Sequence, residues 1–186
     1  MKMPRSVGKA LLSACVVSAV LAEAQSSAQP KEDPWRPVRF MVGEWEGESD
    51  GQPGKGTVKR SYRFVLEDKF LHELNVSTYP PQPKNEKGEV HEHWSFFSYD
   101  RARKAIVLRQ FHQEGFVNQF AILPETNSGT IVFGSEALEN VPSGWKARES
   151  YDVISPDEFV ETFELANAGG NYEVYSKTRF KRARRR

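Results

Sequence analysis

The stretch KARESYDVISPDEFVETFELA, residues 146–166, decides the fold. Apolar and polar residues alternate on both sides of its centre, and a period of two is typical of β-strands that bury one face. A turn centred on Pro156 predicts three cross-strand pairs: Val153 with Phe159, Tyr151 with Glu161, and Glu149 with Phe163. Each pair then lies on one face of the sheet. The stretch therefore predicts an antiparallel hairpin.

The same alternation runs from Trp35 to Arg182, with turn residues at short intervals and no long helical periodicity. It predicts ten strands, at residues 41–49, 56–66, 70–79, 90–99, 104–113, 116–123, 129–136, 145–154, 158–166 and 171–181. Regular short strands in this order favour closure, because closure removes exposed sheet edges. We predict an all-β domain, residues 35–182: a single ten-stranded antiparallel up-and-down β-barrel of the calycin type. A helical turn around Trp35–Phe40 could cap one end.

Three further hairpins follow from their turn residues. A turn at residues 67–69 pairs Phe64 with His72, one at 101–102 pairs Trp94 with Arg109, and one at 114–115 pairs Val107 with Ile122. These registers place Trp94, Phe96 and Phe111 on one face. We take that apolar face to point into the barrel.

The first residues have the pattern of a signal peptide. Lys2, Arg5 and Lys9 precede an apolar run too short to span a bilayer, and Ala22-Glu23-Ala24 has the small residues of a cleavage site. We therefore assign residues 1–24 to a signal peptide and 25–34 to a disordered leader, and we expect a periplasmic or secreted protein. Residues 12–15 also resemble a lipoprotein box, a match we interpret as chance. The only cysteine, Cys15, would leave with the signal peptide.

Basic residues gather at the other end of the chain. Seven of the last ten residues are lysine or arginine, and residues 183–186 form a basic tail. No aromatic stacking pattern accompanies the tail, so the sequence favours a solvated end over a nucleic-acid partner. No second hydrophobic segment could form a transmembrane helix. The sequence leaves the oligomeric state open.

Single charges interrupt several apolar faces of the predicted barrel: Arg60, Arg109, Glu149 and Glu161. An unpaired buried charge costs several kcal/mol, so these side chains must pair with each other or face a wet cavity. In one interpretation, an arginine binds an anionic group of a ligand. In the other, the four residues form internal salt bridges and bind nothing.

The histidines are the next candidates. His91 and His93 share a strand face, and the register places His112 opposite His91, so three imidazoles could hold a metal. Because Trp94 and Phe111 are taken as inward, we expect the triad to face solvent and to bind no metal. His72 lies on the predicted apolar face, as a core histidine or an interior ligand.

Three segments together resemble the nitrobindin-type haem-binding β-barrels, within the lipocalin and fatty-acid-binding-protein group. FMVGEWEGE at 40–48 is similar to their opening G-x-W-x-G-E strand, VLRQFHQEGFVNQ at 107–119 to their central strand, and YSKTRFKR at 175–182 to their last. The resemblance implies a ten-stranded barrel with a ligand cavity and a haem held by a histidine in the last strand. Here Val174 occupies that position, so we expect no haem; only His72 could substitute.

The sequence thus predicts an exported barrel that binds a small apolar or anionic molecule, without a cofactor. The predicted ligand-binding residues are Arg60, Tyr62, His72, Trp94, Arg109, Glu149, Tyr151 and Glu161. Two alternatives stay open for this interior. One is a calycin-type lyase or isomerase that uses interior Arg, Glu and Tyr side chains, because paired carboxylates in a semi-dry cavity can acquire separated pKa values. The other is a nitrobindin-like protein with a substitute haem ligand. A third possibility is a purely structural interior, with a partner on the outer face or the basic tail.

Overall fold

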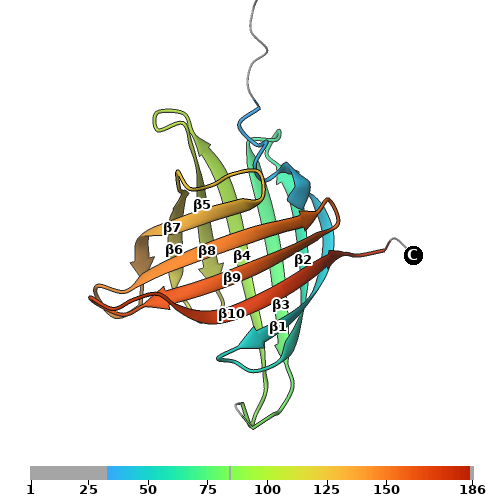
Figure 1. Cartoon of the computed structure of the whole chain (residues 1–186), viewed down its shortest axis with the longest axis vertical. Coiled ribbons are helices and arrows are strands. Elements are labelled where there is room, and N and C mark those ends of the chain that lie inside the picture. The colour runs from blue at the N-terminus through green and yellow to red at the C-terminus, as the bar shows by residue number, and fades with distance from the viewer. Residues whose placement is uncertain (1–32, 84, 185–186) are drawn as a thin grey trace, which may run out of the picture. The chain divides into compact units, whose positions relative to one another are not determined.

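The computed structural model describes residues 33–83 and 85–184. These residues form a closed barrel of ten antiparallel strands, each hydrogen-bonded to the next and β1 to β10 (Figure 1). The strands are β1 (Gly43–Gly51), β2 (Gly56–Val65), β3 (Phe70–Tyr79), β4 (Glu89–Asp100), β5 (Ala105–His112), β6 (Val117–Ile122), β7 (Thr130–Glu139), β8 (Lys146–Ser155), β9 (Glu158–Ala166) and β10 (Glu173–Arg182). The predicted fold class, topology and number of strands are confirmed.

One end of the barrel is filled by an apolar core. The segment before β1 contains a 3-10 turn, η1 (Arg39–Met41), and Trp35, Val38 and Met41 from this segment are buried. They join a layer of inward side chains from the strands: Trp45, Leu71, Phe97, Leu108, Phe120, Phe133, Phe159 and Phe180. The predicted helical turn therefore exists, slightly later than expected, and contributes to this core.

Glycine allows one close approach in this core. An ideal Cβ at Gly47, on β1, would lie 2.8 Å from the Phe180 ring on β10. Beside it, Trp45 donates a hydrogen bond from Nε1 to the Met41 carbonyl, at 2.6 Å. The G-x-W-x-G-E stretch thus joins β1 to the segment before it and makes room for an aromatic ring.

Toward the other end, the same inward faces become polar. This polar layer consists of Arg60, Glu73, Asn75, His93, Ser95, Gln110, Asn118, Glu149 and Glu161, all buried. The change occurs within single strands: β5 has Ile106 and Leu108 inward at one end, and Gln110 and His112 inward at the other. Buried polar groups need partners, so this layer is where a site is expected.

The predicted hairpin registers hold in one of the four cases. The β8–β9 pairs are as predicted, including Val153 with Phe159. Phe64 pairs with Leu71 rather than His72, because the turn has four residues and three of them, Leu66–Asp68, have positive φ. A one-residue slip inverts every side chain of β3 relative to β2, so His72 lies on the outer face.

The registers predicted for the two hairpins that contain β5 are also wrong. Val107 pairs with Ala121 rather than Ile122, because three residues, not two, connect His112 to Phe116. Trp94 pairs with Phe111 rather than Arg109, a shift of two residues that leaves the relative faces unchanged. Two predicted same-face pairs therefore lie on opposite faces, although the order of the strands holds.

Several predictions fall on the undescribed residues: the signal peptide (1–24), most of the leader (25–32) and the last part of the basic tail (185–186). Among the residues that the structure describes, no helix is long and apolar enough to cross a membrane.

Candidate functional site

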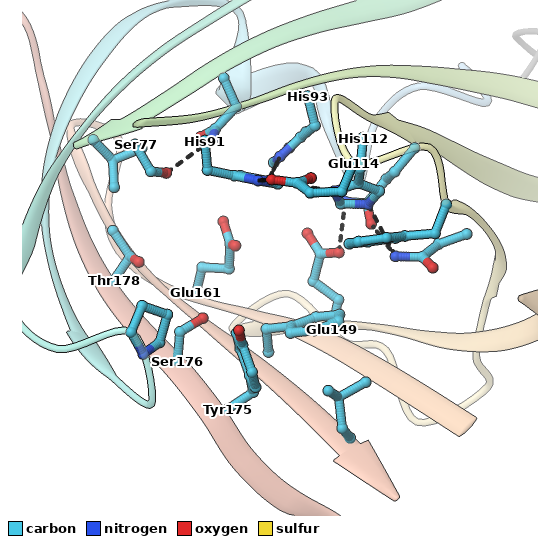
Figure 2. A pocket seen from close by; sticks show the side chains of 18 of the residues that line it. Ser77, His91, His93, His112, Glu114, Glu149, Glu161, Tyr175, Ser176 and Thr178 are labelled. Atoms are coloured by element: carbon cyan, nitrogen blue, oxygen red, sulfur yellow. Dashed lines mark hydrogen bonds and ion pairs between the residues drawn. The ribbon is translucent and has the colours of Figure 1, made fainter. Parts of the chain in front are cut away.

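A cavity of about 420 Å³ occupies the polar half of the barrel. His91, His93 and His112 lie along one side of it, and the carboxylates of Glu149 and Glu161 point toward them from the opposite strands (Figure 2). The apolar part of the lining is formed by Val58, Phe116, Leu138, Val141, Trp145, Phe163 and Leu165. The cavity therefore has a polar zone and an apolar wall, as ligand pockets commonly do.

The three histidines form a tight cluster that lines this cavity. His91 and His93 come from β4 and His112 from the end of β5, where it pairs directly with His93. His91 Nε2 lies 3.3 Å from His93 Nδ1 and 3.3 Å from His112 Nδ1. The clustering is confirmed, but the expectation that the triad faces solvent is wrong.

Each imidazole is held from behind by a polar partner. His91 Nδ1 lies 2.8 Å from Glu114 Oε1 in the β5–β6 turn. His93 Nε2 lies 3.0 Å from Glu73 Oε1 on β3, and His112 Nε2 lies 3.1 Å from Asn118 Nδ2 on β6. A carboxylate beside the second ring nitrogen, as at His91 and His93, is typical of histidines that bind metals.

The local environment keeps His112 neutral. Burial, together with the neighbouring His93 and His91, lowers the pKa of His112 to about 2. A neutral imidazole retains a lone pair on one ring nitrogen, which can bind a metal or accept a proton. The amide nitrogen of Asn118 faces Nε2, so Nε2 holds this lone pair as the ring stands.

Arg60 is the central cation of the polar layer. It forms an ion pair with Glu161 through Nη1, and its Nε lies 3.2 Å from Glu73 Oε1 and 2.9 Å from Asn75 Oδ1. Its guanidinium also lies 4.4 Å from the centre of the Phe180 ring. Although burial raises the pKa of Glu73, Arg60 and His93 hold this pKa below its usual value. Each of the three guanidinium nitrogens of Arg60 is thus engaged by a protein group.

The surroundings of Glu149 shift its pKa upward, in the direction opposite to that of Glu73. Burial and the nearby carboxylates of Glu161 and Glu73 raise the pKa of Glu149 to about 8. Gln110 donates a hydrogen bond from Nε2 to Glu149 Oε2, at 2.9 Å, and Tyr151 donates from Oη to Oε1. At neutral pH the cavity therefore contains a protonated carboxyl group, which can donate a proton or a hydrogen bond.

The structure brings five of the eight predicted site residues into the barrel and leaves three outside. Arg60, Glu149 and Glu161 line the cavity, and the buried rings of Tyr62 and Tyr151 lie next to it. The other three lie on the outer face.

Two errors explain why these three residues lie outside. The register predicted for the β2–β3 hairpin was wrong by one residue, and the face of β4 and β5 that was expected to point inward points outward. Trp94 is 50% exposed, and His72 packs against Trp94 and Phe96 on the outer surface. Arg109 donates hydrogen bonds to Gln119 and Ser98 instead of meeting a glutamate in the interior. The prediction that Arg109 points into the barrel is therefore wrong, whereas the pairing predicted for Arg60 with a glutamate is confirmed.

Glu73, Gln110 and Asn118 also belong to the site, although no sequence motif indicated them. The histidine triad was expected to lie outside the barrel. The His-x-His spacing was a sufficient signal for the triad. The neighbouring aromatic residues, however, led to the prediction that the opposite face of the strand points into the barrel.

The residues of the last strand do not fit a histidine-bound haem. β10 (Glu173–Arg182) contains no histidine, and Val174, at the position that the resemblance indicates, is 53% exposed. His72 cannot replace it, because its side chain lies on the outer face of β3. Neither residue can therefore supply the axial ligand that the resemblance implies.

Comparison with known proteins supports the fold alone. No family model and no curated protein matches the chain. The crystal structure of Rv2717c from M. tuberculosis is similar, with a TM-score of 0.61 and 12% identity over 82% of this chain and 99% of that one. A protein of unknown function of the DUF3598 family from Nostoc punctiforme covers 82% of this chain and 100% of its own, at 8% identity and a TM-score of 0.29. The first likeness shows that the two chains share a fold.

Proposed function

We propose that the protein binds a small organic molecule inside its barrel. The observation that carries this proposal is the cavity of about 420 Å³, which combines an apolar wall with convergent polar groups. Cavities of roughly 300–1,000 Å³ with this composition commonly hold small ligands. The resemblance to nitrobindin-type barrels is consistent with an interior ligand, but it names haem, which the last strand does not fit.

The lining indicates the chemistry of the ligand. Arg60 is already engaged by Glu161 and Glu73, so it is not available to neutralise an anion. The protonated Glu149 and the hydroxyl group of Ser176 can donate hydrogen bonds. The site therefore suits a molecule with an apolar body and one or two oxygen acceptors, rather than a strongly anionic one.

Filling the cavity should weaken the binding of a small molecule. Ser176, a small residue on β10, lines the cavity, and replacing it by tryptophan places a bulky indole in the ligand volume. With the neutral dye N-phenyl-1-naphthylamine as the probe, we expect Ser176→Trp to weaken binding at least about tenfold, because steric exclusion removes the apolar contacts. Fluorescence titration of the purified protein measures this change.

The control is Lys177→Trp, which adds the same ring one residue further along, at an exposed position of β10. It should leave the affinity for the dye within about twofold of the wild type. Equal affinities for the wild type and Ser176→Trp would place the dye outside the barrel and contradict the proposal. Where Ser176→Trp does weaken binding, native mass spectrometry of freshly purified protein would identify the natural ligand.

Proton-transfer catalysis, as in a lyase or isomerase, is a second candidate function. It is favoured by Glu149, a carboxyl group in the cavity wall whose pKa is raised to about 8. A group that titrates near neutral pH is suited to acid–base chemistry. Glu149→Gln would separate the two functions, since it abolishes turnover of a substrate but preserves binding of a ligand.

We also propose export through the amino-terminal signal peptide, as the pattern of residues 1–24 indicates. Protein recovered from the periplasm or the medium should begin at Gln25, or less often at Gln29, when sequenced from its N-terminus. A diacylated Cys15 would instead identify a lipoprotein, and retention of Met1 would contradict export.

A further inference from the structure

We propose that His91, His93 and His112 form a binding site for a divalent transition metal, preferably Zn²⁺, with one coordination position open to the cavity. This inference goes beyond the proposed binding of an organic molecule. It stands on three observations: the arrangement of the ring nitrogens, the partners behind them, and the charge of the layer around them.

The hydrogen bonds behind His91 and His93 decide which nitrogens are free. His91 Nδ1 faces the Glu114 carboxylate and His93 Nε2 faces the Glu73 carboxylate, so each of these nitrogens carries a proton. In the neutral rings, His91 Nε2 and His93 Nδ1 then both present lone pairs, 3.3 Å apart. Two facing lone pairs repel each other unless a cation lies between them.

The distances match a metal site. Zinc binds imidazole nitrogens at about 2.0–2.1 Å, which corresponds to about 3.3–3.4 Å between two nitrogens of a tetrahedron. His91 Nε2 lies 3.3 Å from both His93 Nδ1 and His112 Nδ1. One ligand atom from each of the three residues lies within 4.8 Å of the others. Small movements of the side chains would complete the geometry.

His112 needs one local rearrangement. For Nδ1 to bind a metal, Nε2 must carry the proton and donate it to an oxygen, whereas the Asn118 amide presents Nδ2 to it. Rotation of the Asn118 side-chain amide by half a turn places its oxygen next to His112 Nε2. The Gln110 amide must rotate in the same way, so that its nitrogen donates to the Asn118 oxygen. Gln110 Oε1 would then face Glu149, which can donate to it because its raised pKa keeps it protonated.

The charge around the triad also favours a cation. The single guanidinium of Arg60 lies between two carboxylates, Glu73 and Glu161, and Glu114 adds a third at the rim. This part of the barrel therefore has an excess of negative charge that a divalent ion would neutralise. Carboxylates behind the histidines are also the usual means of orienting metal ligands.

Three protein ligands leave a tetrahedral ion with one open position. Glu73 lies fully buried behind His93 and does not line the cavity, while all three rings do, so the open position faces the cavity. A water molecule or an oxygen donor of the bound molecule would occupy it. The bound molecule would then carry a single metal-binding oxygen, such as that of a carbonyl or hydroxyl group.

The test uses the full chain, stripped with EDTA and titrated with Zn²⁺ alone by calorimetry. We expect one Zn²⁺ per chain and a higher temperature of unfolding when the ion is present. Co²⁺ provides a spectroscopic readout, because a four-coordinate site with nitrogen ligands absorbs strongly in the visible range. Absence of stoichiometric Zn²⁺ binding would overturn the proposal and leave a triad that merely shares a proton.

The chain offers a matched control, since its fourth histidine lies outside the barrel. His91→Ala and His112→Ala should each weaken Zn²⁺ binding at least about 100-fold and abolish the Co²⁺ spectrum, whereas His72→Ala should change neither. Glu114→Gln, in a surface turn, should weaken binding about 10- to 100-fold without removing a ligand. An equal loss in His72→Ala would show that binding is nonspecific and overturn the site.

The dye assay separates this inference from the proposed function. Measured in EDTA, dye binding and its loss in Ser176→Trp depend on the cavity alone. Dye binding without Zn²⁺ binding would overturn the metal site and leave the proposed binding of an organic molecule intact. Zn²⁺ binding without dye binding would overturn the proposed binding of an organic molecule and leave the metal site intact.

Discussion

Replacing Arg60 by methionine is expected to lower the free energy of unfolding by about 3–5 kcal/mol. Arg60 is 5% exposed and neutralises Glu161 and Glu73, and Glu73 is completely buried. The variant fills most of the same volume but leaves two carboxylates without their cation. Urea denaturation at pH 7, followed by tryptophan fluorescence, measures the loss.

Arg109→Met is the matched control for this effect. Arg109 lies on the outer face and contacts the neutral side chains of Gln119 and Ser98. Its loss should cost less than about 1 kcal/mol, as is usual for partly exposed polar contacts. Similar losses in the two variants would mean that Arg60 is not the electrostatic centre of the polar layer.

The two arginines also show how far the sequence could predict the fold. Both interrupt an alternating pattern, and the pattern alone predicted the strands to within one to three residues at most ends. Register depends on the turns, and turn length was ambiguous wherever no proline marked the centre. Pro156 fixed the β8–β9 hairpin correctly, whereas Leu66–Asp68 adopt positive φ without glycine and lengthen the β2–β3 turn.

The site was harder to predict because its strands do not obey the usual rule of an apolar interior. In β4, the inward face contains His91, His93 and Ser95, while Trp94 and Phe96 point outward. A rule that buries the more apolar face therefore chooses the wrong one where a cavity replaces the core. For this reason the sequence predicted the histidine cluster but placed it on the outer face of the barrel.

Glu149→Gln is expected to change the pH dependence of stability. Burial and the nearby Glu161 and Glu73 raise the pKa of Glu149 from 4.5 to about 8, so between these values the folded chain holds a proton that the unfolded chain releases. The stabilisation linked to this proton is complete below about pH 4.5 and declines by up to about 1.4 kcal/mol per pH unit, until it is lost above about pH 8. The new amide is neutral at every pH and can keep both contacts, accepting from Gln110 and donating to the Tyr151 oxygen.

The difference in free energy of unfolding between Glu149→Gln and the wild type isolates this group, because all other titrating residues are common to both. Measured by urea denaturation from pH 5 to pH 8, the difference should move steadily in favour of the variant as the pH rises. A difference that stays constant would mean that Glu149 has an ordinary pKa and is ionised at neutral pH. Such a carboxylate could not donate to the Gln110 amide. The half-turn that frees His112 Nδ1 would then lose its support, and so would a proton donor in the cavity.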